Sequence, residues 1–360
     1  MKLKIFSVFV VFFLCGLLFG SPENTFSIVN PYDGIAWEKV VQYKANLHTH
    51  TTVSDGKLHP QHIVDIYASL GYKILSITDH SEMNKNPGNI TYPWENFRNL
   101  VTSGGKSGLY ENRDSKLMGM LAVPGREISQ EHDIGSYFNV SIDINSAKKI
   151  EDVIESIEKN QGLAVLLHPG RYYFTDDWYV NLLKKYPVIV GMEVYNQGDR
   201  YPGCKIIWDN VLTKLMPDRP VWGFSNDDAH RFEHIGKNWN VFLLSNLTIE
   251  ELKHAMEKGQ FYFAYCPDGI NSTPAIIRKI EVDNKNMLIH IEAINCSKIE
   301  WISNGKIVGT GPEYQIKTSD GKVANYVRAK LYGSDNKSVT ELQPFGIQKK
   351  RLIEMQAKLD

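Results

Sequence analysis

The nine residues His48-Thr-His-Thr-Thr-Val-Ser-Asp-Gly56 decide the fold, and they follow an apolar run directly. The run from Val40 to Leu47 is typical of a β-strand, so His48 and His50 stand where that strand ends. Side chains two positions apart at a strand end point the same way, so both imidazoles can bind one metal ion. Asp55 can reach back from the following loop, and Gly56 allows that loop to turn tightly.

The same arrangement recurs up to residue 225, where short apolar runs alternate with helical patterns such as the one from Pro60 to Gly71. A candidate ligand follows each of several apolar runs: His80 follows 72–78, Glu127 follows 121–124, His168 follows 163–167, and Asp228 and His230 follow 220–224. Strands that alternate with helices predict an α/β barrel with parallel strands, whose C-terminal ends form one face. We therefore expect these side chains to converge.

The candidate ligands comprise five histidines and three carboxylates, a set suited to Zn, Mn or Fe. One metal ion needs fewer ligands, so the set implies two or three divalent ions. A single histidine at a strand end is more often structural, but five of them in this pattern favour a metal site. Asp79 is expected to orient an imidazole. Glu193 and Asn196 have three open roles: the floor of the site, a metal ligand, or satisfaction of the backbone.

The pattern changes near the C-terminus. A helix is predicted at 248–258, with Thr248 and Glu251 as a capping box and Gly259 as its C-cap. After about Pro274 short β-type runs and the turn signals Asn304-Gly305 and Asp320-Gly321 predict a small antiparallel β-sandwich. We therefore divide the chain into a signal peptide at 1–20, an N-terminal segment at 21–39, a metallohydrolase barrel at 40–270, the sandwich at 271–347 and a charged tail at 348–360.

The first residues have the layout of a secretory signal peptide: Lys2 and Lys4, an apolar run at 5–19, then small residues. The chain is therefore expected to be exported, as a periplasmic, secreted or surface-attached protein, with no membrane span after cleavage. A lipoprotein modified at Cys15 and an uncleaved anchor are the alternatives. The formal net charge of −1 predicts no nucleic-acid partner. The three cysteines beyond residue 20 have no CxxC spacing, which argues against a disulfide framework.

These motifs resemble those of the PHP (polymerase and histidinol phosphatase) superfamily of metal-dependent phosphoesterases. The similar stretches are HTHTTVSDG at 48–56, TDH at 78–80, GREIS at 125–129, HPG at 168–170, EVYN at 193–196 and NDDAH at 226–230. YVRAKLYG at 326–333 and QPF at 343–345 resemble the tail of exported members. The resemblance implies a distorted seven-stranded (β/α) barrel with a trinuclear site. It also implies that the metal ligands are His48, His50, Asp55, His80, Glu127, His168, Asp228 and His230.

The sequence departs from the family pattern in one place. Many members have a further histidine ligand shortly after the motif glutamate, where this chain reads Gly135-Ser136-Tyr137-Phe138. His132 lies nearby and is a candidate replacement, with a surface histidine as the alternative. Without a replacement, the site would hold two metals firmly and a third weakly or not at all.

The predicted function is hydrolysis of a phosphate ester, on a small molecule or a glycan, by a water that the metals activate. Arg171 is the candidate for holding the phosphate through charge-assisted hydrogen bonds, and His132 is one candidate for protonating the leaving group. Two alternatives stay open: hydrolysis of an amide, carbamate or carboxylic ester at the same metals, and a binding protein in which the sandwich acts. The oligomeric state does not follow from the sequence.

Overall fold

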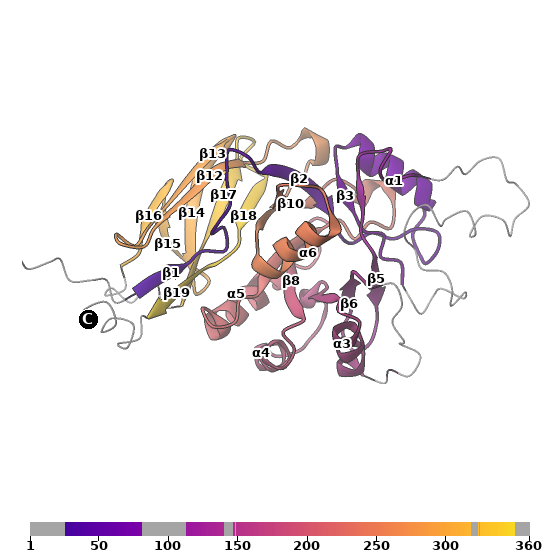
Figure 1. The fold of residues 1–360 in the computed structure, drawn as a ribbon, viewed down its shortest axis with the longest axis horizontal. Helices are drawn as coiled ribbons and strands as arrows, with labels where there is room; N and C mark the ends of the chain where they lie inside the picture. Colours follow the sequence, from indigo (N-terminus) through magenta and orange to yellow (C-terminus); the bar gives the residue numbers. More distant parts are fainter. Residues whose placement is uncertain are drawn as a thin grey trace, which may run out of the picture.

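The computed structural model describes residues 26–80, 113–139, 147, 149–317, 323 and 325–349. An α/β unit and a β-rich unit lie side by side, and the chain passes from the first to the second after β11 (Figure 1). The predicted signal peptide, residues 350–360 of the predicted tail, and the turn at Asp320-Gly321 lie outside the described residues. No helix within the described ranges is long and apolar enough to cross a membrane.

Two sheets form the α/β unit. A five-stranded sheet has the order β5-β6-β7-β8-β9, with β5 at Gly125–Ile128, β6 at Ile134–Tyr137, β7 at Leu163–Leu166, β8 at Ile189–Asn196 and β9 at Trp222–Asn226. The second group is part of an eleven-stranded sheet and comprises β11 (Phe261–Tyr265), β10 (Asn238–Leu244), β2 (Val41–Asn46), β3 (Ile74–Leu75) and β4 (Leu121–Ala122). The helices are α1 (Pro60–Ser69), α3 (Ile150–Lys159), α4 (Asp176–Lys185), α5 (Gly203–Leu215) and α6 (Ile249–Lys258), with 3-10 turns at Pro169–Arg171, Phe232–His234 and Gly269–Asn271.

The two helix ends predicted at Thr248 and Gly259 are confirmed in α6. Thr248 caps α6 by accepting a hydrogen bond from the Glu251 amide, and Gly259 ends the helix with φ +74°. The Glu251 carboxylate does not complete the expected box at Thr248, because it accepts from the amides of Ser245 and Asn246 instead. The apolar stripe of α3 packs into the largest core cluster, which also holds α4 and α5.

The distorted seven-stranded (β/α) barrel that was predicted is not closed, since its strands form two open sheets. β6 runs antiparallel to both β5 and β7, which interrupts the expected parallel order. At the end of the five-stranded sheet opposite β5, β9 is an edge strand. Side chains rather than a paired strand cover its backbone. The amides of Asn240 and Gln343 bond to Ser225 and Gly223 there. The polar side chains that cover this edge thus take the place of a backbone ladder.

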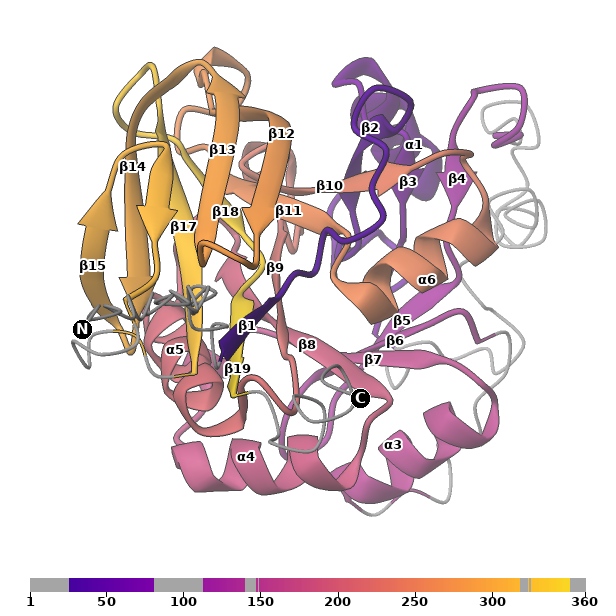
Figure 2. The same cartoon turned by 60° about the vertical axis from the view of Figure 1, so that its left-hand side comes forward.

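The β-rich unit has two layers (Figure 2). One layer is the three-stranded sheet β12-β13-β16, at Ile276–Asp283, Leu288–Ile294 and Glu313–Gln315. The other continues the large sheet, because β18 pairs antiparallel with β11. Its strands are β14 (Cys296–Ser303), β15 (Lys306–Thr310), β17 (Tyr326–Gly333), β18 (Val339–Leu342), β19 (Phe345–Lys349) and β1 (Phe26–Val29).

Two local features of this unit bear on the predictions. The turn between β14 and β15 has Asn304 and Gly305 at φ +50° and +68°, which confirms the hairpin signal. β19 extends to Lys349 and pairs with β1, so residues 348–349 are strand and not the start of a charged tail. The chain segment before the α/β unit therefore contributes a strand to the sandwich.

A buried ion cluster joins the two units. Arg328 of β17 donates two hydrogen bonds to Asp209 of α5, at 3.0 and 2.7 Å, and also bonds to Glu341 of β18. Tyr195 of β8 and Tyr326 add hydroxyl donors, each at 2.7 Å, to Glu341 and Asp209 respectively. The cluster fixes the sandwich against the strand that also carries Glu193.

Candidate metal centre

The carboxyl ends of five strands bring the predicted ligands together. His48 and His50 follow β2, His80 follows β3, Glu127 lies in β5, His168 follows β7, and Asp228 and His230 follow β9. Together with Asp133 and Glu193 they form four overlapping groups, in each of which the ligand atoms lie within 4.8 Å of one another. We name three of these the inner cluster (His48, His50, Glu127, Asp228), the outer cluster (His50, Asp55, His80, His230) and the third cluster (Glu127, Asp133, His168), and the fourth comprises His48, His168 and Glu193.

In the inner cluster four ligand atoms point at one centre. The Nε2 atoms of His48 and His50 lie 3.2 Å apart. The Oε2 atom of Glu127 is 3.2 and 3.0 Å from these two nitrogens, and Oδ1 of Asp228 is 3.3 and 3.1 Å from them. All four residues are buried. Two imidazoles and two carboxylates in this arrangement form a ligand set for a transition metal.

The outer cluster opens toward solvent on the other side of His50. Oδ2 of Asp55 lies 3.1 Å from Nε2 of His230 and 3.8 Å from Nε2 of His80. Its Oδ1 atom is 3.5 Å from Nδ1 of His50. The rings of His50 and His230 stack with their centroids 4.3 Å apart. His50 thus faces one cluster with each of its two ring nitrogens.

Glu127 lies between the inner and third clusters. Its Oε2 atom faces His48 and His50, while its Oε1 atom is 3.1 Å from Nε2 of His168. A carboxylate with one oxygen on each side has the geometry of a bridging ligand. On the far side, Oδ2 of Asp133 is 3.8 Å from the same nitrogen of His168.

The electrostatics of the centre favour positive charge. Burial lowers the pKa of His48, but the carboxylates of Asp228, Glu193 and Glu127 outweigh it and hold that pKa well above its ordinary value. Burial also works against a charged His50, yet bonds to Asp228 and Glu127 raise its pKa to about 10. Burial raises the pKa of Glu127, but the histidines outweigh this effect and hold it well below its usual range. A cation at this centre therefore meets a strongly negative environment.

The hydrogen bonds of His48 indicate that a metal ion fits this centre. Nδ1 of His48 lies 2.9 Å from Oε1 of Glu193, and this carboxylate fixes the ring proton on Nδ1 in the neutral imidazole. Nε2 then faces the carboxylate oxygens of Glu127 and Asp228, an arrangement that requires a cation at this nitrogen, either a proton or a metal ion. Among the described residues, His50 Nδ1, His168 Nδ1 and Asp228 Oδ1 are buried without a hydrogen-bond partner. Buried polar atoms of this kind require an explanation, which metal coordination provides for this centre.

The loop that carries Asp55 is held by other side chains. Asp79 accepts hydrogen bonds from the Thr51 amide, the Thr51 hydroxyl and the Ser54 hydroxyl, at 2.7, 2.7 and 2.6 Å. Asp79 therefore orients this loop, and its expected role in orienting an imidazole stays a prediction. A Cβ atom at Gly56 would lie 2.6 Å from the His50 backbone, so only glycine permits this close approach.

The backbone at two of the predicted ligands is unusual. His168 and Asp228 have φ angles of +31° and +44°, in the left-handed region that non-glycine residues rarely adopt. Gln197, whose own φ is +46°, donates a hydrogen bond of 3.0 Å to the Asp228 carbonyl. Strained backbone of this kind clusters at functional sites, where the surrounding structure maintains it.

The two residues predicted to be catalytic differ in their surroundings. His132 is buried against Tyr172 and Trp178, donates from Nδ1 to the Asp133 carbonyl at 2.8 Å, and has its pKa lowered to about 3 by burial. Neutral His132 is a poor proton donor, so this geometry gives no support to its role as a general acid. Arg171 lies at the rim of the third cluster, half exposed, with Nη1 3.0 Å from Oδ2 of Asp133.

The sequence reasoning missed Asp133 and left the role of Glu193 open. Asp133 directly follows His132, and it occupies the position beside His168 for which His132 was considered. Only the pairing of β6 with β5 and β7 reveals which of these two neighbours faces the centre. Glu193 accepts four hydrogen bonds, from His48, Asn226, Asn196 and the His168 amide. Because these bonds occupy both oxygens, Glu193 orients its neighbours.

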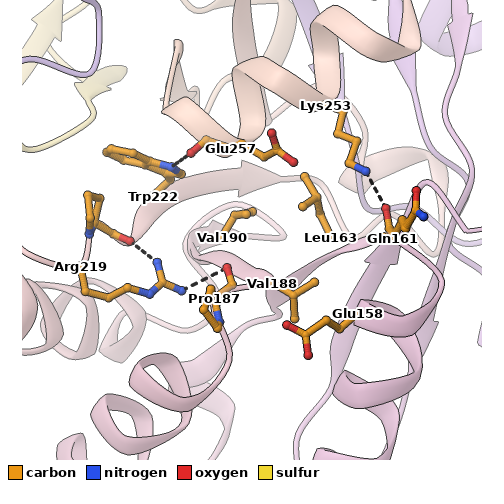
Figure 3. A pocket seen from close by; sticks show the side chains of 12 residues that line it. Glu158, Gln161, Leu163, Pro187, Val188, Val190, Arg219, Trp222, Lys253 and Glu257 are labelled. Atoms are coloured by element: carbon orange, nitrogen blue, oxygen red, sulfur yellow. Dashed lines mark hydrogen bonds between the residues drawn. The ribbon is translucent and has the colours of Figure 1, made fainter.

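Another cavity in the described structure lies apart from this centre. It has a volume of about 440 Å³ and lies between α3, α6 and the amino ends of β8 and β9 (Figure 3). Its polar side chains bond to the framework: Arg219 to the Pro220 carbonyl, Trp222 to the Glu257 carbonyl and Lys253 to the Gln161 carbonyl. This cavity contains none of the predicted ligands, so it does not compete with the metal centre as a candidate active site.

Comparison with known proteins supports the fold. No protein-family model and no curated protein matches this sequence. A two-domain protein from Bacteroides vulgatus that contains a predicted PHP-like metal-dependent phosphoesterase superposes with a TM-score of 0.50, at 14% identity over 88% of this chain and 89% of that one. The two-domain PHP-like fold expected from the motifs is thereby confirmed, and the fold places its buried His, Asp and Glu clusters at the strand ends.

Two further solved structures match about half of the chain. They are a proposed metal-dependent phosphoesterase from Bifidobacterium adolescentis and an amidohydrolase from Chromobacterium violaceum. Each is 14% identical and covers 52% of this chain and 87% of its own, with TM-scores of 0.36 and 0.35.

Proposed function

We propose that this chain is a metal-dependent phosphoesterase, acting as a phosphatase or phosphodiesterase. The observation that carries the proposal is the inner cluster, in which each of two carboxylate oxygens lies within 3.3 Å of two imidazole nitrogens. The adjoining outer and third clusters provide places for a second and a third ion. Zinc, manganese and iron all suit these ligands.

Divalent ions at this centre would activate a water and neutralise charge on the ester oxygens. The chain's own residues prepare the centre for this chemistry. Glu193 holds His48 in the tautomer whose Nε2 lone pair faces the centre. Glu127 presents one oxygen to each of two clusters, so it can keep two ions at a fixed separation.

Arg171 is the residue that favours a phosphate ester as the substrate. Asp133 anchors its Nη1 atom at 3.0 Å beside the third cluster, and about half of the Arg171 side chain is exposed at the rim. A guanidinium held in this way can bind two oxygens of a phosphate group through charge-assisted hydrogen bonds. We therefore propose that Arg171 holds the substrate phosphate while the clusters bind the metals.

The test compares substrates on the chain loaded with zinc, manganese or iron. The expected result is hydrolysis of p-nitrophenyl phosphate or its bis ester, with a loss of activity in Asp228→Asn. Faster cleavage of a p-nitrophenyl carboxylic ester or an amide than of either phosphate ester would favour the alternative hydrolase. Absence of hydrolysis on every substrate by a chain with bound metal would contradict both enzyme proposals and favour a binding role.

We also propose that the enzyme acts outside the cytoplasm on a small-molecule or glycan-linked phosphate ester. The support is the charged and apolar pattern of the first 20 residues. Fractionation of cells that express the full chain tests the location. Retention of the full-length protein in the cytoplasm would contradict it.

A further inference from the structure

Two side-chain amides cover the open edge of β9. Asn240 accepts from the Ser225 amide at 3.1 Å and donates to the Ser225 carbonyl at 3.0 Å. Gln343 forms the same pair of bonds with Gly223, at 2.8 and 2.9 Å. A backbone N–H only donates and a carbonyl only accepts, so these bonds fix the orientation of both amides.

Of these two amides, Asn240 continues toward the metal centre. Its Nδ2 atom also donates to Oδ1 of Asn226 at 2.9 Å. The same oxygen of Asn226 accepts from the Leu47 amide at 3.0 Å, so Nδ2 of Asn226 must point the other way. That Nδ2 atom donates to Oε1 of Glu193 at 2.9 Å.

The path ends on His48. Oε1 of Glu193, which accepts from Asn226, also lies 2.9 Å from Nδ1 of His48. Asn240, Asn226, Glu193 and His48 are each at most 1% exposed. Water therefore cannot replace a lost bond, and a broken link would leave a buried polar group unsatisfied.

We propose that Asn240 and Asn226 are positioning residues of the metal centre. Together they hold Glu193 so that His48 keeps its proton on Nδ1 and directs its Nε2 lone pair into the inner cluster. A reversed Asn226 amide would place its oxygen against the Glu193 carboxylate and release His48. The inference rests on the metal centre of the proposed function, but it concerns metal affinity and the His48 tautomer, not turnover.

The matched variants are Asn240→Leu and Gln343→Met. Each removes one pair of bonds to the β9 backbone, at Ser225 and at Gly223 respectively. Only Asn240→Leu interrupts the path to His48. We expect it to weaken zinc binding to the metal-free full chain by roughly 10- to 100-fold, as loss of a residue behind a metal ligand does. Gln343→Met should bind zinc as the wild type does. Competition with a chromophoric chelator measures both affinities.

A second measurement determines the tautomer of His48 in the wild type. Nitrogen-15 NMR of the zinc-loaded wild type should show the His48 proton on Nδ1 and zinc on Nε2, assigned by its loss in His48→Ala. The opposite tautomer would overturn the inference, and so would equal affinity losses in the two variants or an unchanged affinity in Asn240→Leu. If the wild type binds no cation, the proposed function fails as well. A wild type that binds zinc, with unaffected variants, overturns this inference alone.

Discussion

The chain has two buried clusters of charged side chains, and they differ in how completely their polar atoms are paired. In the cluster between the two units, Arg328 lies between Asp209 and Glu341, and two tyrosine hydroxyls complete the carboxylates. In the metal centre, carboxylates face imidazole nitrogens, and three buried atoms have no hydrogen-bond partner among the described residues. The Arg328 cluster and the inner cluster of the metal centre are both buried.

The difference distinguishes a structural cluster from a binding site. A buried charge is tolerated when its partners lie in the chain, and removal of one partner is then costly. The Arg328 cluster contains its own counter-charge, so folding alone completes it. In the inner cluster the ring nitrogens of His48 and His50 meet the carboxylates of Glu127 and Asp228 through protons, which a bound metal ion can replace. Variants of the two clusters should therefore affect different properties.

Arg328→Met should produce the largest change in stability. It leaves Asp209 and Glu341 buried without their cation, and loss of one partner from a buried ion cluster costs about 3–5 kcal/mol. Urea denaturation of the metal-free chain measures the free energy of unfolding. Lys214→Met is the matched control, because Lys214 pairs with Asp177 on the surface, and its loss should leave stability unchanged. Equal midpoints for the two variants would contradict a structural role for the Arg328 cluster.

Glu127→Gln should act mainly on activity. We expect hydrolysis to fall by at least the roughly 10²–10³-fold that loss of one charge-stabilising group costs an enzyme. The metal-free chain should also lose some stability at neutral pH, because the histidines that hold the pKa of Glu127 well below its usual range lose a charged partner. Initial rates with p-nitrophenyl phosphate and urea denaturation test the two halves. A variant that keeps its activity but unfolds more easily would assign Glu127 to the framework.

Metal removal sharpens the same comparison. A ligand that binds only the folded state at 100 times its Kd stabilises that state by about 2.7 kcal/mol. Zinc or manganese should therefore raise the Tm of the wild type, and a chelator should reverse the rise. Arg328→Met should retain this increment at a lower Tm, whereas Asp228→Asn should lose much of it. An equal increment in Asp228→Asn would place the bound metal elsewhere.

The sequence predicted those parts of the centre that depend on local order. The strand ends were recognisable because a polar residue interrupts each apolar run. These residues are His48, His80, Glu127, His168 and Asp228. The convergence of their side chains was predicted from the parallel strands of one barrel, and it occurs although these strands belong to two sheets. The signals at Thr248, Gly259 and Asn304-Gly305 were equally local, and each is confirmed, although Glu251 does not complete the predicted capping box.

Long-range pairing was beyond the sequence. The open edge of β9 depends on Asn240 and Gln343, which are 15 and 120 residues from the strand positions they bond. The choice of Asp133 over His132 depends on how the chain enters β6, where the Asp133 carbonyl accepts from the Leu167 amide and the Asp133 carboxylate lies beside His168. The continuity of the sandwich with the large sheet rests on the pairing of β11 with β18. None of these pairings has a local sequence signal.

Lys44 should give the smallest change in stability. Its ammonium group is paired less completely than Arg328 but more completely than the groups of the metal centre. It lies over the rings of Tyr72 and Trp239, at 4.1 and 3.9 Å, and burial lowers its pKa from 10.5 to about 8. Because the folded pKa is below the unfolded one, the folded state disfavours the charged form. This cost is fully present below about pH 8 and disappears as the pH rises toward 10.5.

The stability of the wild type should therefore rise, relative to Lys44→Met, between these two pH values. Taking the difference between the two proteins removes the titration of the buried tyrosines, which both contain. Urea denaturation at several pH values across this window measures it. A flat difference would mean that the two rings and the Asp227 carboxylate compensate the buried charge fully. Lys44 would then be a paired group like Arg328, and not an unsatisfied one like the metal centre.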